Sequence, residues 1–424
     1  MAARKTVKSA VEKTVDKTDQ KAAATQRDAV FRKRMLIGIG AGVGVIAALT
    51  AVLFILTIQT TPRPVQAQSA LTIESDRLLD MGLVAHPDGF RPLTGLPFFL
   101  DASLDEAQRA EQAAAIINAR PINMKIENSY DARPQAGLSR ADVVYESLAE
   151  GGITRFNCVF QSDLTAEVGP VRSARISDIS IVPQYQGILF YSGSSEYVGY
   201  QLGNADLPRI TEGVEGFRRV EDRYAPHDLF YTLPLAYADA WDAGYETTLA
   251  YPPTLEFLRM ASPEDVALAA VLGLDIPLFS ADTLNPPATP VSQFIVPFSP
   301  GFECEWQWSG EGLGGRWLRS QDGISIEALD DTQVAATNVV VLWAYHYEID
   351  PYQGLDIGGE TYEIDLNGSG YASVFSQGGR IDGTWETDGT TPPRLRDYNG
   401  AVIYLTPGNT WFQVLPPDTD VSAW

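Results

Sequence analysis

An uninterrupted apolar segment near the amino terminus is the strongest constraint on how this chain can fold. Residues Met35 to Ile58 are 24 consecutive residues without a charge. As a helix they would be about 36 Å long, against a bilayer hydrocarbon core of about 30 Å. A soluble core helix rarely stays apolar on every side over such a length, so the segment predicts a single transmembrane helix.

The charges on either side of this segment predict its orientation. The preceding 34 residues carry ten basic and four acidic side chains, and Arg32-Lys33-Arg34 adjoins the apolar run. The positive-inside rule then places residues 1–34 in the cytoplasm as a basic tail, with the bulk of the chain outside the cell. A cleaved signal peptide is the alternative, because Ala67-Gln68 resembles a cleavage site, although the apolar run is longer than usual signals.

Four glycines in the apolar segment suggest how two copies could meet. They form two pairs at the small-xxx-small spacing of transmembrane helix dimers, Gly38 with Gly42 and Gly40 with Gly44. Glycine is also frequent in transmembrane helices that do not dimerise. A homodimer and a plain anchor therefore both remain open.

Composition divides the rest of the chain. Residues 59–90 read as a linker, 91–285 as a domain of mixed helices and strands, 286–300 as a Pro-rich linker and 301–417 as a β-rich domain. Asn399-Gly400 and Gly378-Gly379 are dipeptides typical of tight hairpins. The expected fold class is α+β: an amino-terminal transmembrane helix, a mixed α/β extracytoplasmic domain, then a smaller antiparallel β-rich domain.

Composition also excludes several functions. The 54 acidic residues outnumber the 31 basic ones, which argues against nucleic acid as a partner. His86, His227 and His346 are too widely spaced for a zinc motif, so we expect no metal site and no cofactor. No Gly-x-Ser-x-Gly elbow is present. Cys158 and Cys304 cannot form a disulfide scaffold, although a single disulfide between them remains an alternative.

The segment from Asp142 to Gln161 carries the strongest functional signal. Two β-prone runs flank Gly151-Gly152, which predicts a hairpin with a two-residue turn. In that register one face is polar and carries Glu146, Glu150, Arg155 and Asn157. The opposite, apolar face is expected to be core and carries Tyr145, Ser147, Phe156, Cys158 and Phe160. The polar face is either a cross-strand charge pairing or the floor of a binding or catalytic cleft.

Arg172 and Arg175 follow Gly169-Pro170 at an expected helix start. Residues three apart share a helix face, so the two guanidiniums could hold one anion together. The alternative is that they form salt bridges with Glu146 or Glu150. Lys125 is the single lysine after the apolar segment.

Several motifs in order closely resemble the DUF3048 family, also called YerB-like proteins. They are PLTGLP at 92–97, RPINMKIENSYDARPQAGLSRADVVYESLAEGGITRF at 120–156, GPVRSAR at 169–175, APHDLFYT at 225–232, and NGSGYASVF, GGRIDGTW and LRDYNGAVIYLTPGNTWFQVLP between 367 and 416. The family has no established biochemical activity, and the resemblance implies an extracytoplasmic lipoprotein or membrane-anchored protein. This chain departs from it at His227, which Asp228 follows where the family often has Asn, and in lacking a lipobox cysteine after the apolar run.

The expected function is that of a membrane-anchored, extracytoplasmic binding or interaction protein of the cell envelope. Its partner would be a wall polymer or an envelope protein, and an anionic group would be held by bidentate arginine contacts. The candidate ligand-binding residues are Lys125, Glu127, Asn128, Arg133, Glu146, Glu150, Arg155, Arg172, Arg175 and His227.

Other interpretations remain open. Trp385 and Trp411 are expected either to stack on sugar rings or to cap the β core. The chain could also be an envelope enzyme of the hydrolase type, with Glu146 and Glu150 or His227-Asp228 as acid and base, although no catalytic residue is assigned. The third interpretation is a scaffold whose charged motifs form a satisfied buried network.

Overall fold

The computed structural model describes residues 83–258, 285–310, 315–326, 332–349 and 361–424. All of these lie in one compact unit, Arg63–Trp424. The predicted cytoplasmic tail and transmembrane segment lie outside the described residues. Within the described ranges, no helix has the length and apolar character needed to cross a membrane.

The described chain begins with two strands and a helix. Strands β1 (Leu83–Phe90) and β2 (Pro97–Asp101) pair antiparallel, and α3 (Glu106–Ile117) packs Ala113 against Phe98 and Leu100. The helix begins where it does because Asp105 and Gln108 form a reciprocal capping box, with side chain to backbone distances of 2.9 and 3.0 Å.

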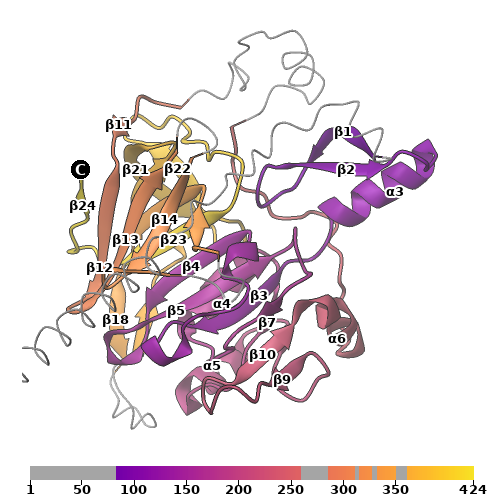
Figure 1. Cartoon of the computed structure of the whole chain (residues 1–424), viewed down its shortest axis with the longest axis horizontal. Coiled ribbons are helices and arrows are strands. Elements are labelled where there is room, and N and C mark those ends of the chain that lie inside the picture. The colour runs from indigo at the N-terminus through magenta and orange to yellow at the C-terminus, as the bar shows by residue number, and fades with distance from the viewer. Residues whose placement is uncertain (1–82, 259–284, 311–314, 327–331, 350–360) are drawn as a thin grey trace, which may run out of the picture. The chain divides into compact units, whose positions relative to one another are not determined.

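An 11-stranded mixed sheet forms the centre of the unit (Figure 1). Its strands from the first half of the chain are β3 (Ile122–Glu127), β4 (Val143–Leu148), β5 (Thr154–Phe160), β7 (Ile188–Phe190) and β8 (Arg209–Ile210). Its strands from the second half are β11 (Thr289–Pro290), β17 (Asn338–Trp343), β20 (Gly368–Ser376), β21 (Gly379–Thr387), β22 (Arg394–Asp397) and β23 (Thr410–Leu415). The spatial order is β11-β21-β20-β17-β23-β4-β5-β3-β7-β8, with β22 beside β21.

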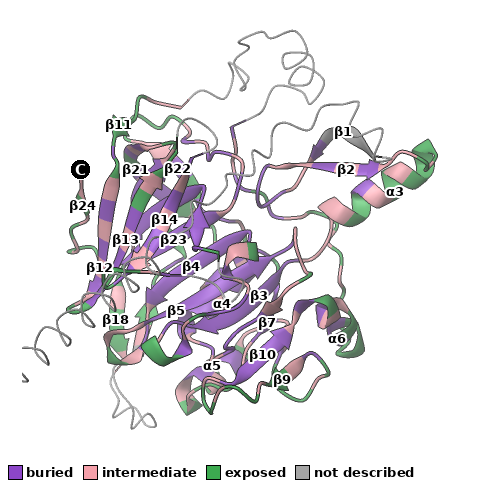
Figure 2. Ribbon diagram, in the orientation of Figure 1, coloured by how far each residue is buried: buried purple, intermediate pink, exposed green. Residues whose placement is uncertain are grey.

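The two halves of the chain meet inside this sheet. Strand β23 pairs in parallel with β4, from Thr410 opposite Val143 to Gln413 opposite Glu146. Strand β17 is also parallel to β23, so the second half of the chain is not purely antiparallel. Every residue of β3, β5 and β23 is buried, and Figure 2 shows the same for the centre of the sheet. Burial on both faces includes polar residues of these strands, among them Gln413 of β23, whose side-chain amide has no hydrogen-bond partner among the described residues.

A second, antiparallel sheet covers one face of the first. It consists of β12 (Gln293–Ser299), β13 (Phe302–Ser309), β14 (Arg316–Gln321), β15 (Ile324–Ser325), β16 (Ala335–Ala336) and β24 (Ser422–Ala423). Aromatic rings join the two sheets: Phe294 stacks on Phe375 at 3.7 Å, and Trp306 meets Trp411 edge-on at 5.3 Å between ring centroids. The α+β class and an antiparallel β sheet in the second half of the chain are therefore confirmed.

The opposite face of the large sheet is covered by α4 (Ile176–Gln184) and neighbouring loops. Tyr145 stacks on Phe412 at 4.6 Å, and its hydroxyl lies 3.1 Å from that of Tyr185. Trp411 and Trp385 are 0% and 1% exposed, and each belongs to one of the hydrophobic cores that flank the large sheet. They cap the β core, so the expectation that they stack on sugars is wrong.

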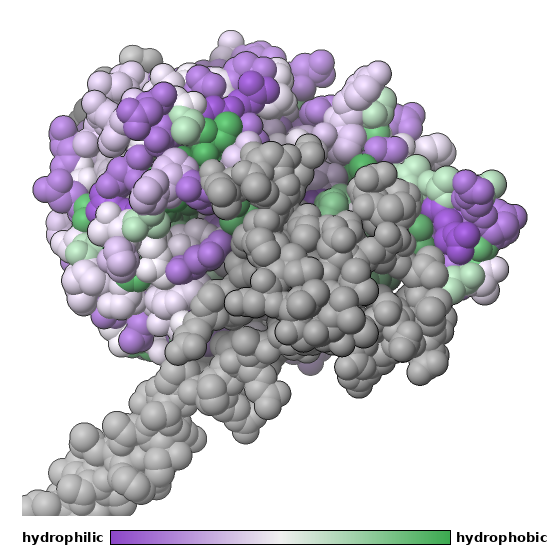
Figure 3. All heavy atoms as spheres, turned by 90° about the horizontal axis from the view of Figure 1, so that it is seen from above, coloured by the Kyte–Doolittle hydropathy of each residue, from purple (hydrophilic) through white to green (hydrophobic). Residues whose placement is uncertain are grey.

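Smaller elements surround this core. A three-stranded sheet contains β6 (Glu167–Val168), β10 (Leu229–Thr232) and β9 (Phe217–Arg219), and β18 (His346–Ile349) pairs with β19 (Thr361–Ile364). Among the described residues the other helices are α5 (Glu196–Asn204) and α6 (Ala236–Asp242), and short 3-10 turns lie at 130–132, 138–140, 150–152 and 233–235. On the face shown in Figure 3, hydrophilic and hydrophobic residues are interspersed outside the grey atoms.

The β4–β5 hairpin differs from its prediction by one residue of register. Glu146 pairs with Phe156 and Ser147 with Arg155, whereas a two-residue turn at Gly151-Gly152 would pair Glu146 with Asn157. The chain instead forms a 3-10 turn, closed by a 2.8 Å bond from Ala149 N to Ile153 O. Because side chains alternate along a strand, this single step puts Glu146 and Arg155 on opposite faces. The predicted shared polar face is therefore wrong.

Asp142 joins the start of β4 to the residues after β5. Its Oδ2 accepts the backbone N–H groups of Gln161 at 2.6 Å and Ser162 at 2.7 Å. Complete burial raises the pKa of Asp142 to about 6, above its usual 3.8.

The raised pKa of Asp142 predicts a pH-dependent stability. The protonated carboxyl favours the folded state, so its contribution is complete below pH 3.8 and is lost as pH rises through about 6. The loss amounts to about 3 kcal/mol at 1.36 kcal/mol per pKa unit. Denaturant unfolding of wild type and Asp142→Asn at pH 4 and pH 7 measures it, since Asn can accept the same N–H groups without titrating. A stability difference between the two proteins that is equal at both pH values would contradict the prediction.

Candidate functional site

The structure separates the predicted site residues into two polar clusters on opposite faces of the large sheet. The Glu127 cluster lies on the α4 side and contains Lys125, Glu127, Glu150, Arg155, Arg172, Arg175 and His227. The Glu146 cluster faces the second sheet and contains Asn128 and Glu146. Arg133 reaches the backbone of Asn128 at 3.3 Å and Asp322 at 3.7 Å.

Glu127 is the centre of the first cluster. Its carboxylate is 2% exposed, and its Oε2 lies 2.8 Å from His227 Nδ1 and 3.1 Å from Arg172 Nε. Its Oε1 lies 3.4 Å from Arg155 Nη2 and accepts the Ser129 hydroxyl at 2.9 Å. The strand register explains why Arg155 lies beside this carboxylate, because Glu127 on β3 pairs directly with Arg155 on β5.

Lys125 forms the deepest ion pair of this cluster. Its Nζ lies 2.9 Å from Asp178 of α4, and both side chains are at most 1% exposed. Burial lowers the pKa of Lys125, and the Asp178 carboxylate opposes that shift. Asp178 also accepts Asn157 Nδ2 at 2.9 Å and the backbone N–H of Arg175 at 2.7 Å, which caps the helix. Asp178 thus ties α4 to the sheet.

Arg172 and Arg175 do not share a helix face, because α4 begins only at Ile176. Arg175 binds Glu150 through Nε at 2.9 Å and through Nη2, and its Nη1 donates to two backbone carbonyls. The salt bridge to Glu150 is therefore confirmed, and the joint grip on one anion is wrong. Arg172 differs because only its Nε lies near a carboxylate, 3.1 Å from Glu127 Oε2, and this Nε makes no hydrogen bond among the described residues. Its two terminal nitrogens have no partner among the described residues, and its side chain is 25% exposed.

The Glu127 cluster has more positive than negative charge. Four cations, Lys125, Arg155, Arg172 and Arg175, face three carboxylates, Glu127, Glu150 and Asp178, so one positive charge is unbalanced even with a neutral His227. Burial and the neighbouring Arg175 lower the pKa of Arg155 to about 10, still far above neutrality. The unbalanced charge is nearest to solvent at Arg172.

The Glu146 cluster is enclosed between the two sheets. Glu146 and Arg319 are both 0% exposed, and Arg319 Nη2 lies 2.9 Å from Glu146 Oε1. The same oxygen accepts Thr154 Oγ1 at 2.8 Å and Asn128 Nδ2 at 3.1 Å. The guanidinium also lies 5.4 Å from the ring centroids of Phe156 and Trp411. This cluster binds one sheet to the other and has no open side.

Sequence reasoning missed Arg319, Gln321 and Asp178. Arg319 and Gln321 share the core-facing side of β14 with Trp317, all of them buried. The sequence alone gives no sign that these two polar side chains are buried. Which residues would meet Glu146 could not be read from it, because the contact spans 173 positions in the sequence.

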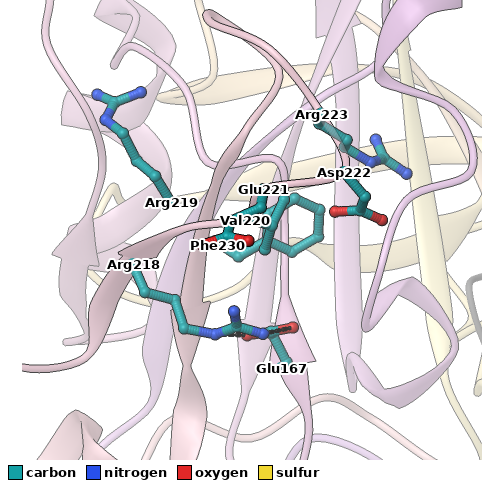
Figure 4. A pocket seen from close by; sticks show the side chains of 8 residues that line it. All are labelled: Glu167, Arg218, Arg219, Val220, Glu221, Asp222, Arg223 and Phe230. Atoms are coloured by element: carbon teal, nitrogen blue, oxygen red, sulfur yellow. Dashed lines mark hydrogen bonds and ion pairs between the residues drawn. The ribbon is translucent and has the colours of Figure 1, made fainter.

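A surface pocket lies elsewhere (Figure 4). It has a volume of about 510 Å³ and is lined by Glu167, Arg218, Arg219, Val220, Glu221, Asp222, Arg223 and Phe230. Its arginines are engaged: Arg218 reaches Glu167, Arg219 binds Asp228 at 2.7 Å, and Arg223 donates to the carbonyls of Ala132 and Pro134. None of the predicted site residues lines it.

Neither cysteine offers a reactive thiol. Cys158 and Cys304 are both buried and not joined in a disulfide. Burial raises the pKa of each thiol well above its usual value, so the thiolate is suppressed. In the described parts of the chain, no group of three His, Cys, Asp or Glu side chains is placed to hold a metal ion.

Comparison with known proteins identifies the family. Residues 108–246 match the profile described as "Protein of unknown function (DUF3048) N-terminal domain", and residues 294–412 match the corresponding C-terminal domain. The chain belongs to the DUF3048 family, as its motifs predict.

Two comparisons point to the same relative in Bacillus subtilis (strain 168). Its "Putative lipoprotein YerB" is 28% identical over 338 residues, which cover 78% of this chain and 87% of that protein. The crystal structure of the Bacillus subtilis YerB protein superimposes with a TM-score of 0.61 at 24% identity, over 79% of this chain and 99% of that chain. The likeness to that structure establishes a common fold.

Proposed function

We propose that this protein binds an anionic ligand at the cell envelope, with Arg172 as the contact residue. The free end of the Arg172 guanidinium is the observation that carries the proposal, because all nitrogens of the neighbouring Arg175 are engaged. Two parallel N–H groups match the two oxygens of a carboxylate or phosphate. The unbalanced positive charge behind Arg172 adds attraction for an anion with one negative charge.

The proposed location is the outer side of the cell membrane. Its support is the apolar segment Met35 to Ile58 with its basic flank, together with the description of the Bacillus relative as a lipoprotein. In this proposal the helix anchors the chain by a single span, and the domain at 91–285 and the β-rich domain at 301–417 stand outside. A wall polymer or an envelope protein would supply the anion, and the span glycines would allow a homodimer.

The Glu146 cluster favours a second, structural role. Each of its charged groups is fully buried and partnered across the two sheets, which is the arrangement of an internal brace. Glu146 and Glu150 also belong to different clusters, so they cannot flank one substrate as acid and base. We therefore assign binding to the Glu127 cluster and bracing to the Glu146 cluster.

Ligand-dependent stabilisation tests the proposed binding. The full chain in detergent is unfolded thermally with a panel of anionic sugars, wall fragments and simple carboxylates. A ligand at 100 times its Kd stabilises the folded state by about 2.7 kcal/mol, which raises the melting temperature measurably. We expect Arg172→Gln to abolish that rise.

A matched control separates the site from general surface charge. Arg218→Gln removes another arginine of the outer surface, 52% exposed and paired with Glu167. It should leave the ligand-dependent rise unchanged. An equal rise in wild type and Arg172→Gln, or no rise with any ligand, would contradict the proposal.

A further inference from the structure

We infer that the ligand carries a hydrogen-bond donor, a hydroxyl or N–H, next to its anionic group, and that His227 selects for it. This inference rests on the proposed anion binding at Arg172. It goes further by assigning a ligand class: hydroxy acids and hydroxylated sugar acids, as opposed to anions without a neighbouring donor.

The first step is that Arg172 and His227 are held by the same atom. Oε2 of Glu127 lies 3.1 Å from Arg172 Nε and 2.8 Å from His227 Nδ1. The carboxylate itself is buried and further fixed by Arg155 and Ser129, so it is a rigid support. The guanidinium and the imidazole therefore both contact one carboxylate oxygen.

The second step concerns the free nitrogen of the imidazole. A carboxylate can only accept, so Nδ1 of the neutral ring carries the hydrogen and donates it to Glu127. Nε2 then has a lone pair and no hydrogen. It has no partner in the described part of the chain, and the side chain is 15% exposed. The ring therefore offers an acceptor to a ligand, beside a guanidinium that offers only donors.

The third step is to ask which ligand groups would complement Arg172 and His227. The terminal N–H groups of Arg172 satisfy two oxygens of the anion, whereas Nε2 of His227 is satisfied only by a hydroxyl or N–H of the ligand. An anion lacking that donor leaves the acceptor unpaired in a half-buried position, and the hydrogen bond is lost. A 2-hydroxycarboxylate carries both groups on adjacent carbons.

The test compares two anions that differ in one hydroxyl. Lactate and propionate are titrated into the full chain in detergent at pH 9 and equal ionic strength. We expect lactate to bind about fivefold more tightly than propionate, the effect of one ordinary hydrogen bond. His227→Phe should remove the preference for lactate over propionate, whereas Arg172→Gln should weaken the binding of both anions.

The outcomes separate the two proposals. Equal affinity of the wild-type protein for lactate and propionate would overturn the role of His227 and leave the proposed anion binding standing. This comparison uses the wild-type protein alone, so it does not depend on whether a variant folds. Binding of neither anion, nor of galacturonate or its polymer, would overturn the proposed function as well. Tighter binding of polygalacturonate than of galacturonate would identify a polymer as the source of the hydroxylated anion. Tighter binding of galacturonate would identify a free sugar acid as the source.

Discussion

Arg319→Met is expected to lower the free energy of unfolding by about 3–5 kcal/mol. The change leaves the Glu146 carboxylate fully buried without its cation, and an uncompensated buried charge is strongly destabilising. Denaturant unfolding followed by tryptophan fluorescence measures the effect, because Trp411 lies beside the guanidinium.

The double variant Glu146→Leu with Arg319→Met should recover most of this loss. Replacing a whole buried pair by apolar residues of similar volume is often neutral or stabilising. Arg218→Met serves as the control, because its pair with Glu167 is exposed and should be worth no more than about 1 kcal/mol. A loss below 1 kcal/mol in Arg319→Met would show that Glu146 is not an ionised brace.

Lys125→Met is expected to cost a similar amount, about 3–5 kcal/mol, because it strips the buried Asp178 of its cation. Here the double variant with Asp178→Leu should not recover the loss. Asp178 also accepts from Asn157 and from the backbone N–H that begins α4, and both donors would remain buried and unpaired.

The contrast between the two pairs is itself measurable. Unfolding free energies at one pH for wild type and, in each pair, both single variants and the double variant, six variants in all, give a double-variant cycle for each pair. Arg140→Met is the control, since Arg140 and Asp163 form an exposed pair at 3.0 Å. Full recovery in the Lys125 and Asp178 double variant would mean that Asp178 does not fasten α4 to the sheet.

Much of the local structure could be predicted from the sequence. The hairpin at Gly378-Gly379 exists as β20 and β21, although its turn is Gln377-Gly378, both with positive φ. The β-rich character predicted for the second half of the chain is seen in the buried strand β17 and its neighbours in the large sheet. These predictions succeed because turn chemistry and apolar runs act over a few neighbouring residues.

The sequence singled out residues that the structure brings together, but it did not predict how they are arranged. Glu127, Arg155 and His227 were all named in advance, yet the face assigned to Glu146 was wrong. The loop between β4 and β5 decided that outcome, since one residue of slip exchanges the two faces of a strand. Turn geometry of this kind depends on how the strands are held by the rest of the sheet.

By itself, the sequence determined the family, the apolar segment and the collection of charged residues between Lys125 and Arg175. Those properties are local or compositional, so they can be read from neighbouring letters. Only the tertiary structure decided that Glu146 meets Arg319 inside the molecule and that His227 and Arg172 share the buried carboxylate of Glu127. The physical reason is that burial and charge pairing depend on residues far apart in the sequence, which are brought together only when the sheets pack.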